Sequence, residues 1–332
     1  MTAFKALFQN NLSYKLVPLP LREIFYIETV PCDVYGISDG LFELLIEKNT
    51  EVEKELLVNL VGGGHKSIFV HQDEAELFVK LQQDNLRNIS RSLSIGNPIE
   101  KSRQFLGLLS VNLAYLYKDP TNKELLELQH QCVLNFSKFL SENIKLQGQI
   151  FEEYLKQKHH YIYAQPLLSS LFLFGILKQT KLYSDKEIEA LFVTSYFKDI
   201  GMSAIPEEKY EQDKLSEADK EIFKDHPLHS VELLSGKLGF SKDKLKIIEN
   251  HHVFSLLAND GNLDDKETDL MMYGIETMLV TITDIIAAMI TERPYRPATN
   301  LFDALHLVRQ LISDQYSQEF KLLVTYFKNF FG

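Results

Sequence analysis

The stretch Phe197-Lys-Asp-Ile-Gly-Met-Ser-Ala-Ile-Pro206 lies in a long region, from about Glu152 onward, in which the segments have the periodicity of helices. Short polar turns separate these segments, and no convincing strand pattern occurs among them. The pattern therefore predicts an all-α domain over residues 152–332. Polar residues lie at the ends of its helices: Lys198-Asp199 in the quoted stretch, then His226-Pro227, His251-His252 and Asp284.

Histidine and carboxylate side chains together suit divalent ions such as iron, manganese or zinc. A carboxylate that bridges two such ions is a common arrangement in phosphate-ester hydrolases. None of these residues has the compact spacing of a His-Glu-x-x-His site, and a single histidine on a helix is more often structural. The interpretation therefore rests on the order of these residues in the chain and on the residues next to them in the sequence.

That order resembles the HD-GYP family, the bacterial cyclic di-GMP phosphodiesterases within the HD phosphohydrolase superfamily. Phe197–Pro206 looks like the family's His-Asp-Ile-Gly-Lys-x-x-Ile-Pro segment, and Leu215–Pro227 resembles the helix after it, which ends in His-Pro. Thr283–Arg296 is similar to the family's helix with an aspartate and its Arg-Pro-Tyr-Arg turn, and this match is the most specific. Together the matches span roughly Gln165 to Phe331.

The resemblance implies a role for each matched residue. Asp199 takes the place of the metal-bridging carboxylate, and with Lys198 it forms the candidate catalytic pair. Further metal ligands are implied at His226, His251, His252 and Asp284. Arg293 and Arg296 are candidates for binding a phosphate or a carboxylate.

The chain departs from the family at four places. Lys198 replaces the histidine of the His-Asp pair, and Met202 replaces a lysine that lies near the substrate phosphate. The upstream helix histidine falls near Gln165-Pro166, and His159-His160 stand about two turns too early to substitute for it. Val253–Gly261 stands where the family has its Gly-Tyr-Pro loop.

These departures have an electrostatic consequence. Losing two histidines leaves Asp199 and Asp284 facing each other on one side of the site, and two buried carboxylates repel unless a cation separates them. Lys198 is predicted to fold back and supply that charge, although an ammonium cannot activate a bound water as a metal does. The other side, with Asp199, His226 and the His251-His252 pair, still predicts a site for at most one divalent ion. In the structural alternative, Lys198 points to solvent, His226 caps a helix and Arg-Pro-Tyr-Arg is a corner of the fold.

The first part of the chain has a different pattern. Apolar runs flank Ser38-Asp39-Gly40, which predicts a β-hairpin because glycine accepts the positive φ of the turn. Thr50, with Glu53 three residues later, predicts the capping box of a helix that Gly62-Gly-Gly-His ends, and Ser67-Ile-Phe-Val predicts another strand. We expect a small α+β domain over residues 1–83, which resembles, more weakly, the small domain that often precedes HD-GYP domains.

Residues 84–151 are expected to form a helical connector between the two domains. The helical pattern breaks near Gly96-Asn-Pro98 and at Asp119-Pro120. Leucines recur at spacings of three and four on one face, at Leu106, Leu109, Leu113 and Leu116. Because such a connector often pairs with a copy of itself, a homodimer is expected through it.

Composition excludes several classes of protein. The 332 residues are 45% hydrophobic and 24% charged, which is typical of a folded globular chain. The net charge of −11 argues against binding to nucleic acid or to a membrane surface. Two cysteines make no disulfide framework, and the apolar run Leu167–Leu177 is too short and too interrupted to span a membrane. Met1–Gln9 does not have the pattern of a signal peptide, so a reduced, cytoplasmic protein is expected.

Three functions stay open from the sequence. The preferred one is a non-hydrolytic signalling or interaction module that retains cyclic di-GMP or a protein as its partner. The second is a phosphodiesterase or phosphohydrolase that works with one metal ion. The third is a metal-free helical scaffold, comparable to the HDOD group.

Overall fold

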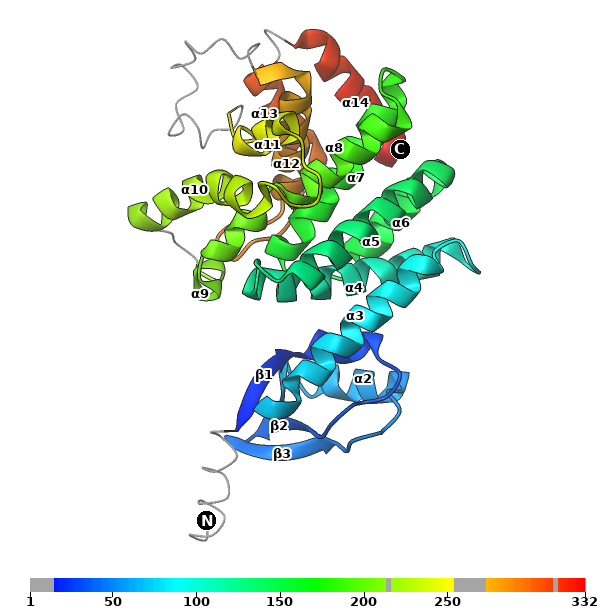
Figure 1. Cartoon of the computed structure of the whole chain (residues 1–332), viewed down its shortest axis with the longest axis vertical. Helices are drawn as coiled ribbons and strands as arrows, with labels where there is room; N and C mark the ends of the chain where they lie inside the picture. The colour runs from blue at the N-terminus through cyan, green and yellow to red at the C-terminus, as the bar shows by residue number, and fades with distance from the viewer. Residues whose placement is uncertain (1–14, 213–215, 254–272, 313–315, 332) are drawn as a thin grey trace. The chain divides into compact units, whose positions relative to one another are not determined.

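The computed structural model describes residues 15–212, 216–253, 273–312 and 316–331. The chain divides into two compact units (Figure 1). The first runs from the N-terminus to Ser92 and includes Gln104–Asn112, and the second contains the remaining residues to the C-terminus. The predicted fold class is confirmed, because a four-stranded sheet comes first and helices follow. The three-part division proposed from the sequence, with boundaries after residues 83 and 151, stays a prediction.

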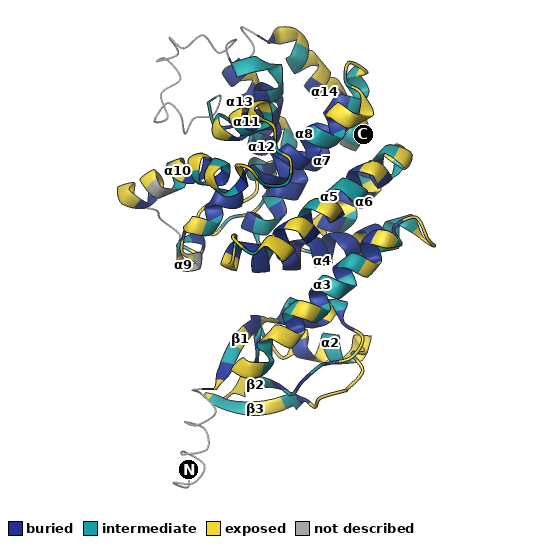
Figure 2. Cartoon of the chain, in the orientation of Figure 1, coloured by how far each residue is buried: buried dark blue, intermediate teal, exposed yellow. Residues whose placement is uncertain are grey.

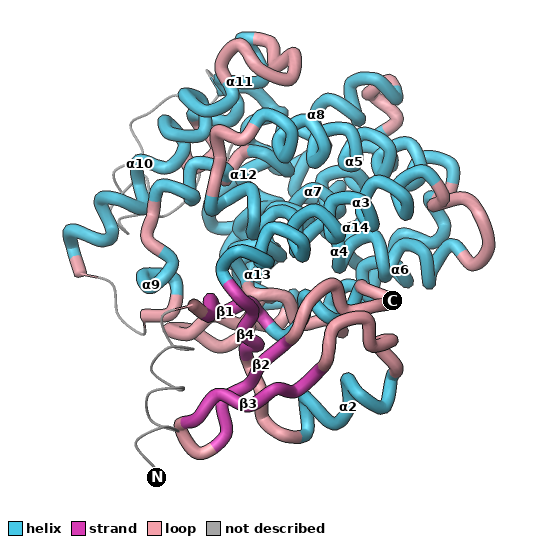
Figure 3. Tube along the Cα trace, turned by 60° about the horizontal axis from the view of Figure 1, so that its bottom comes forward, coloured by secondary structure: helices cyan, strands magenta, loops and turns pink. Residues whose placement is uncertain are grey.

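One antiparallel sheet forms the base of the first unit, with the strand order β1-β4-β2-β3 (Figure 3). Its strands are β1 (Leu16–Pro20), β2 (Val34–Ser38), β3 (Leu41–Ile46) and β4 (Ser67–His71). Asp39 and Gly40, with φ of 50° and 74°, join β2 to β3. Two successive positive φ angles make the tight hairpin turn that Asp-Gly predicts, and this prediction is confirmed.

The first helix of this unit begins later than the sequence suggests. Helix α2 (Lys54–Gly62) has Glu53 at its N-cap, and no side chain caps it. The prediction of a capping box at Thr50 is therefore wrong. The backbone around Thr50 is paired instead, because Val30 N donates to Thr50 O at 3.0 Å and Val52 N donates to Glu28 O at 2.8 Å. Pairing with a distant segment outweighs a local capping preference.

Helices complete the first unit. The 3₁₀ turn η1 (Leu21–Tyr26) follows β1, the 3₁₀ turn η2 (Gln72–Glu74) follows β4, and α3 (Ala75–Arg91) comes next. Side chains of α2 and α3, among them Leu60 and Phe78, pack with Ile68 and Val70 of β4 in one buried core. The glycines after α2 form the predicted turn, with φ of 76° at Gly64.

The helical breaks after α3 occur where the sequence predicts them. Helix α4 (Pro98–Lys118) starts behind Asn97, whose side chain accepts hydrogen bonds from Ile99 N and Glu100 N. The helix α5 (Lys123–Glu142), the turn η3 (Ile144–Leu146) and the helix α6 (Gln147–Leu155) follow. The four leucines of the predicted stripe are buried within this chain. A homodimer would therefore need other residues of the connector, and the homodimer stays a prediction.

The second unit is built around one apolar helix, α7 (Tyr161–Thr180). It packs against α8 (Asp185–Phe197), α12 (Gly274–Ile290) and α14 (Ser317–Phe331). Among the described residues, α7 is the one helix long and apolar enough to cross a membrane, but 83% of its apolar window is buried inside the protein (Figure 2). The sequence prediction of a core helix is consistent with this burial. The remaining elements are η4 (Ile200–Ala204), α9 (Glu207–Tyr210), α10 (Glu217–Leu234), α11 (Lys242–Glu249) and α13 (Leu301–Ile312).

Candidate metal centre

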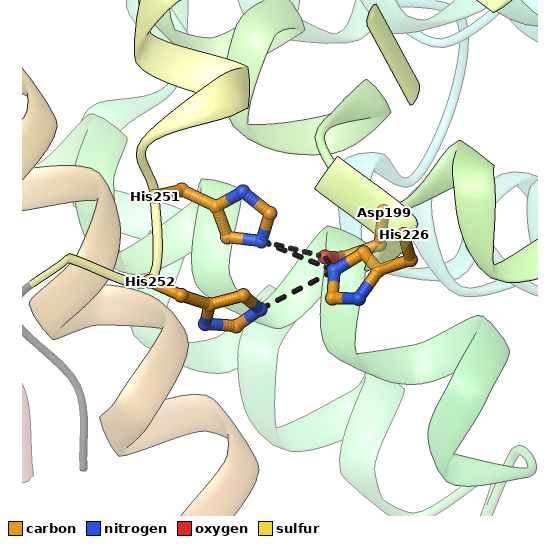
Figure 4. Close-up of side chains that lie close together, drawn as sticks. All are labelled: Asp199, His226, His251 and His252. Atoms are coloured by element: carbon orange, nitrogen blue, oxygen red, sulfur yellow. Dashed lines mark hydrogen bonds and ion pairs between the residues drawn. The ribbon is translucent and has the colours of Figure 1, made fainter. Parts of the chain in front are cut away.

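Four polar side chains from three helical segments of the second unit converge. Asp199 follows α8, His226 lies in α10, and His251 and His252 follow α11. One ligand atom from each lies within 4.8 Å of all the others (Figure 4). Asp199, His226 and His251 are buried, and His252 is partly buried.

The distances inside this cluster are short and similar. Asp199 Oδ1 lies 3.3 Å from His226 Nε2 and 3.2 Å from His251 Nε2. His226 Nε2 is also 3.3 Å from both His251 Nε2 and His252 Nε2. The Nε2 atoms of these histidines and one carboxylate oxygen therefore face a common point.

Backbone carbonyls hold two of the imidazoles in this orientation. Pro227 has no N–H, which leaves the carbonyl of Phe223, four residues earlier in α10, without its helical donor. His226 Nδ1 donates to that oxygen at 2.6 Å. His251 Nδ1 donates in the same way to Ile248 O, near the end of α11, at 2.6 Å. With the protons on Nδ1, the Nε2 lone pairs point into the cluster, as in metal-bound histidines.

The donor set fits a divalent cation. Nε2 of His226, Nε2 of His251 and Asp199 Oδ1 all act as acceptors, and acceptors about 3.3 Å apart repel unless a cation or a shared proton lies between them. Imidazole and carboxylate are ligands of iron, manganese and zinc. When bound, such an ion supplies Lewis acidity and lowers the pKa of a coordinated water.

A close contact between η4 and α10 fixes the position of Asp199. A Cβ on Gly201 would lie 2.1 Å from His226 O, so only glycine fits there. Gly201 N donates to Ser230 Oγ at 2.8 Å, and the same hydroxyl donates to His226 O at 2.9 Å. Tyr117 OH donates to Asp199 O at 3.0 Å. Neither Tyr117 nor Ser230 carries a signal in the sequence, because both act through contacts between distant segments.

Lys198 lies beside the cluster and not in solvent. Its side chain is fully buried, its ammonium donates to Asp199 Oδ2, and Nζ lies 2.6 Å from Asp284 Oδ1. The predicted placement of Lys198 is confirmed, and the alternative that it points to solvent is wrong. Asp284 therefore pairs with Lys198 and is not one of the four convergent side chains.

These contacts shift pKa values in both directions. Burial alone would raise the pKa of Asp199, but the Lys198 ammonium lowers it well below its ordinary value. Burial opposes the charge on Lys198, yet Asp199 and Asp284 raise its pKa. The pKa of His252 is well below its usual range because of burial and the neighbouring imidazoles. The lysine and Asp199 are therefore an ion pair, and His252 is neutral.

Gln165 connects this ion pair to the Arg-Pro-Tyr-Arg turn. Gln165 Nε2 donates to Asp284 Oδ1 at 2.8 Å, and its Oε1 accepts from Arg293 Nη2. The Arg293 guanidinium lies 4.9 Å from the centre of the Tyr161 ring. The sequence indicated Gln165 only as the residue near a missing histidine.

The two arginines of the turn differ in what they contact. Arg293 and Arg296 pair through their backbones, with Arg293 N donating to Arg296 O at 2.9 Å. Arg296 Nη2 donates to Ala288 O at 2.6 Å, so its side chain fastens the turn to α12. This contact favours the structural role for Arg296. Arg293 is connected to the site through its hydrogen bond to Gln165 Oε1.

The histidines before α7 lie outside the four-residue cluster, as their position in the sequence suggests. His160 Nε2 lies 2.8 Å from Glu211 Oε1. The His159 ring stacks on Tyr154 with a centroid distance of 5.1 Å. The segment that stands in place of the Gly-Tyr-Pro loop lies, beyond Val253, outside the described residues.

A cavity of about 240 Å³ adjoins the cluster and is lined in part by Asp199, His226, His252 and Asp284. Met202 also lines it and is 8% exposed. The residue that stands in place of the family's phosphate-side lysine therefore presents an apolar side chain to this cavity.

No family model and no curated protein matches the chain. Among solved structures, the chain is similar to Bd1817, a HDG"Y"P protein from Bdellovibrio bacteriovorus. The likeness covers 94% of this chain and 99% of that one, with a TM-score of 0.63 and 16% sequence identity. The chain therefore has an HD-GYP-like fold, as the sequence motifs predict.

Proposed function

We propose that this protein is a non-hydrolytic signalling or interaction module of the HD-GYP type, which holds at most one divalent ion. The observation that carries the proposal is the position of the Lys198 ammonium between Asp199 and Asp284. In the related family this side of the site belongs to a metal-bound histidine. A lysine there neutralises the carboxylates without providing a Lewis acid.

The contact with Lys198 also limits the number of ions that Asp199 can bind. One of its oxygens accepts from Lys198 and the other faces the imidazoles, so it has no free oxygen with which to bridge two ions. The second ion of a binuclear site would also have to displace a buried ammonium. Loss of one of two catalytic ions costs several kcal/mol of transition-state stabilisation, or roughly a thousandfold in rate.

Metal analysis combined with a hydrolysis assay tests the proposal. The purified protein is loaded with excess Mn²⁺, Fe²⁺ or Zn²⁺, desalted, and analysed for metal per chain. Its reaction with cyclic di-GMP is followed by chromatography of linear pGpG and GMP. We expect at most one ion per chain and no product above the Asp199→Ala control. Steady production of pGpG that Asp199→Ala abolishes would refute the non-hydrolytic role.

The second candidate is a phosphodiesterase that uses a single ion. The four convergent ligands of the cluster favour it, because they retain one complete set of donors beside a cavity. The metal-loaded protein distinguishes the two candidates by turnover. An empty site under the same loading conditions would favour the metal-free scaffold instead.

A signalling role also requires a partner. The acidic composition supports a protein partner over nucleic acid or a membrane surface. Cyclic di-GMP is the small molecule that the family resemblance suggests as a ligand. Binding assays with this nucleotide are therefore needed beside the turnover assay.

A further inference from the structure

The two edge strands of the sheet in the first unit differ in how they are protected against further pairing (Figure 3). At one edge, Pro18 and Pro20 of β1 have no N–H group to donate, and such prolines are typical of edges that stay unpaired. At the other edge, the six residues of β3 include no proline, so each keeps its backbone donor. No further strand pairs with the outer side of β3 among the residues that the structure describes. The edge of β3 can therefore accept another strand.

The sheet face turned away from the core is apolar beside this edge. Phe69 lies between two core residues of β4, so its side chain points to the opposite face. Its ring contacts that of Phe42 in β3 at a centroid distance of 5.1 Å, and Phe42 pairs with Ile37 of β2. Ile37 and Leu44, which share this face, are 45% and 47% exposed. A strand added to β3 would find apolar side chains to pack against on this face.

The same segment of the chain is acidic. Asp39 in the hairpin turn, Glu43 in β3 and Glu47 directly after β3 are all exposed. Lys48 is the nearest base along the chain. Because side chains alternate along a strand, Glu43 points to the face opposite that of Phe42. The edge therefore presents an apolar face on one side and a carboxylate on the other.

These charges decide between two kinds of partner for the edge. A second copy would pair β3 with β3 about a two-fold axis, which would bring the acids of both copies together. Like charges across paired strands are destabilising, and a charge on an edge strand is a common protection against self-pairing. A strand that carries basic side chains would instead complement the acids. Charge complementarity therefore favours a different protein over a second copy.

We propose that the edge of β3 binds an extended segment of a partner protein in which apolar side chains alternate with lysine or arginine. The backbone of this segment pairs with the outward N–H and C=O groups of β3. Its apolar side chains continue the face of Phe42 and Leu44, and its basic side chains lie on the side of Glu43. The inference deepens the interaction role proposed above, and it rests on that role for the choice of a protein as the partner.

Fluorescence anisotropy with a synthetic peptide tests the inference. The probe is a fluorescein-labelled peptide as long as β3 that alternates lysine and valine, titrated with the full-length chain. The control peptide has the same composition, but its lysines are grouped at one end, so it has the same charge without the alternation. We expect saturable binding of the alternating peptide and binding weaker by about threefold or more for the grouped one. Amide hydrogen exchange in Leu41–Ile46 should also slow when the alternating peptide is added, and exchange in α2 should not.

Two substitutions in β3 show whether the peptide occupies this edge. Leu44→Lys removes an apolar contact, and Glu43→Lys reverses the charge on the other face. Each should weaken binding of the alternating peptide by about threefold or more. Val58→Lys and Glu55→Lys make the same changes in charge at exposed positions of α2, and these matched controls should bind the peptide as the parent does.

Circular dichroism confirms that each variant is folded, and sedimentation gives the oligomeric state. If Leu44→Lys does not fold, Glu43→Lys and the exchange experiment still decide the question. Absence of saturable binding, equal binding of the grouped peptide, or equal weakening by the α2 variants would each overturn the inference. A parent dimer that Leu44→Lys dissociates would also overturn it, because a second copy would then occupy the edge. Metal content and hydrolysis are measured separately, so a failure of peptide binding is distinguishable from a failure of the non-hydrolytic role.

Discussion

Lys198 carries a positive charge at the place where HD-GYP proteins have a histidine. Because this lysine is buried, its charge must be balanced by neighbouring side chains. A buried ammonium is stable only with partners, and here it has two carboxylates, Asp199 and Asp284. In turn, the lysine ammonium compensates the negative charge of both carboxylates. The three side chains form a unit in which removing one member leaves the others with an unbalanced charge.

Lys198→Met should therefore destabilise the protein strongly. Methionine keeps most of the side-chain volume but leaves two buried carboxylates without their cation, which costs roughly 3–5 kcal/mol. Denaturant unfolding at neutral pH measures the loss. Lys220→Met is the matched control, because Lys220 Nζ also lies 2.6 Å from a carboxylate oxygen, that of Glu217, and the Lys220 and Glu217 side chains are 52% and 88% exposed. An exposed pair contributes about 0–1 kcal/mol, so equal losses in the two variants would contradict the charge-replacement role.

Lys198→His should raise the amount of bound metal. The substitution removes the ammonium and adds an imidazole nitrogen on the side of Asp199 and Asp284. Metal per chain after loading and desalting, compared with the parent protein, measures the effect. We do not expect the variant to regain hydrolysis, because Gln165 and Met202 still replace the other family residues. Unchanged metal content in a folded variant would show that this side of the site cannot hold an ion.

Helix α10 shows how one element serves both stability and the site. Its proline frees the Phe223 carbonyl that orients His226. At its start, Ser216 and Asp219 cap each other's backbone N–H groups, and Asp219 also accepts from Lys209 of α9. The histidine of the cluster is therefore held by a helix whose first turn is fastened to its neighbour.

The cap of α10 predicts that the stability of the protein depends on pH through Asp219. The hydrogen bond from Lys209, then those from Ser216, lower the pKa of Asp219 from 3.8 to about 2. A lowered pKa means that Asp219 contributes stability above pH 3.8, and that this contribution is lost as the pH falls toward 2. Asp219→Asn should thus be less stable than the parent at pH 6, with the difference vanishing near pH 2. Asp225→Asn, at an exposed position of the same helix, is the control. A difference that persists unchanged at low pH would contradict the assignment.

At the scale of the whole molecule, the cluster joins segments that lie far apart in the chain. Asp199 follows α8, His226 lies in α10 and the His251-His252 pair follows α11. Thr281 Oγ1 of α12 donates to His251 O at 2.6 Å. An ion bound by the folded cluster therefore stabilises the native state against the unfolded chain. This coupling gives metal binding a readout that does not depend on catalysis.

A divalent ion should raise the unfolding temperature of the protein. At a free concentration one hundred times the dissociation constant, the gain in unfolding free energy is about 2.7 kcal/mol. Thermal unfolding with and without Zn²⁺ or Mn²⁺, after treatment with a chelator, measures the shift. His252→Gln, at a partly buried ligand, should reduce the shift. No shift with either ion would indicate a metal-free scaffold.

Local sequence by itself determined the elements whose signals are local. Asp39-Gly40 specified the hairpin because two positive φ angles are required there, and Asn97 and Pro98 specified the start of α4. The order of Lys198-Asp199, His226-Pro227, His251-His252 and Asp284 indicated the fold and the residues of the site. Thr50 shows the limit of this reasoning, since pairing with residues 28–30 displaced the helix start.

Only the tertiary structure decided how those residues meet. Sequence reasoning left Lys198 free to point to solvent, and the approach of α12 brought Asp284 within reach of its ammonium. The roles of Gln165, Tyr117 and Ser230 depend on contacts across 29 to 119 positions of the chain. Such contacts leave no periodic signal in a single sequence, because they arise from the packing of one helix against another.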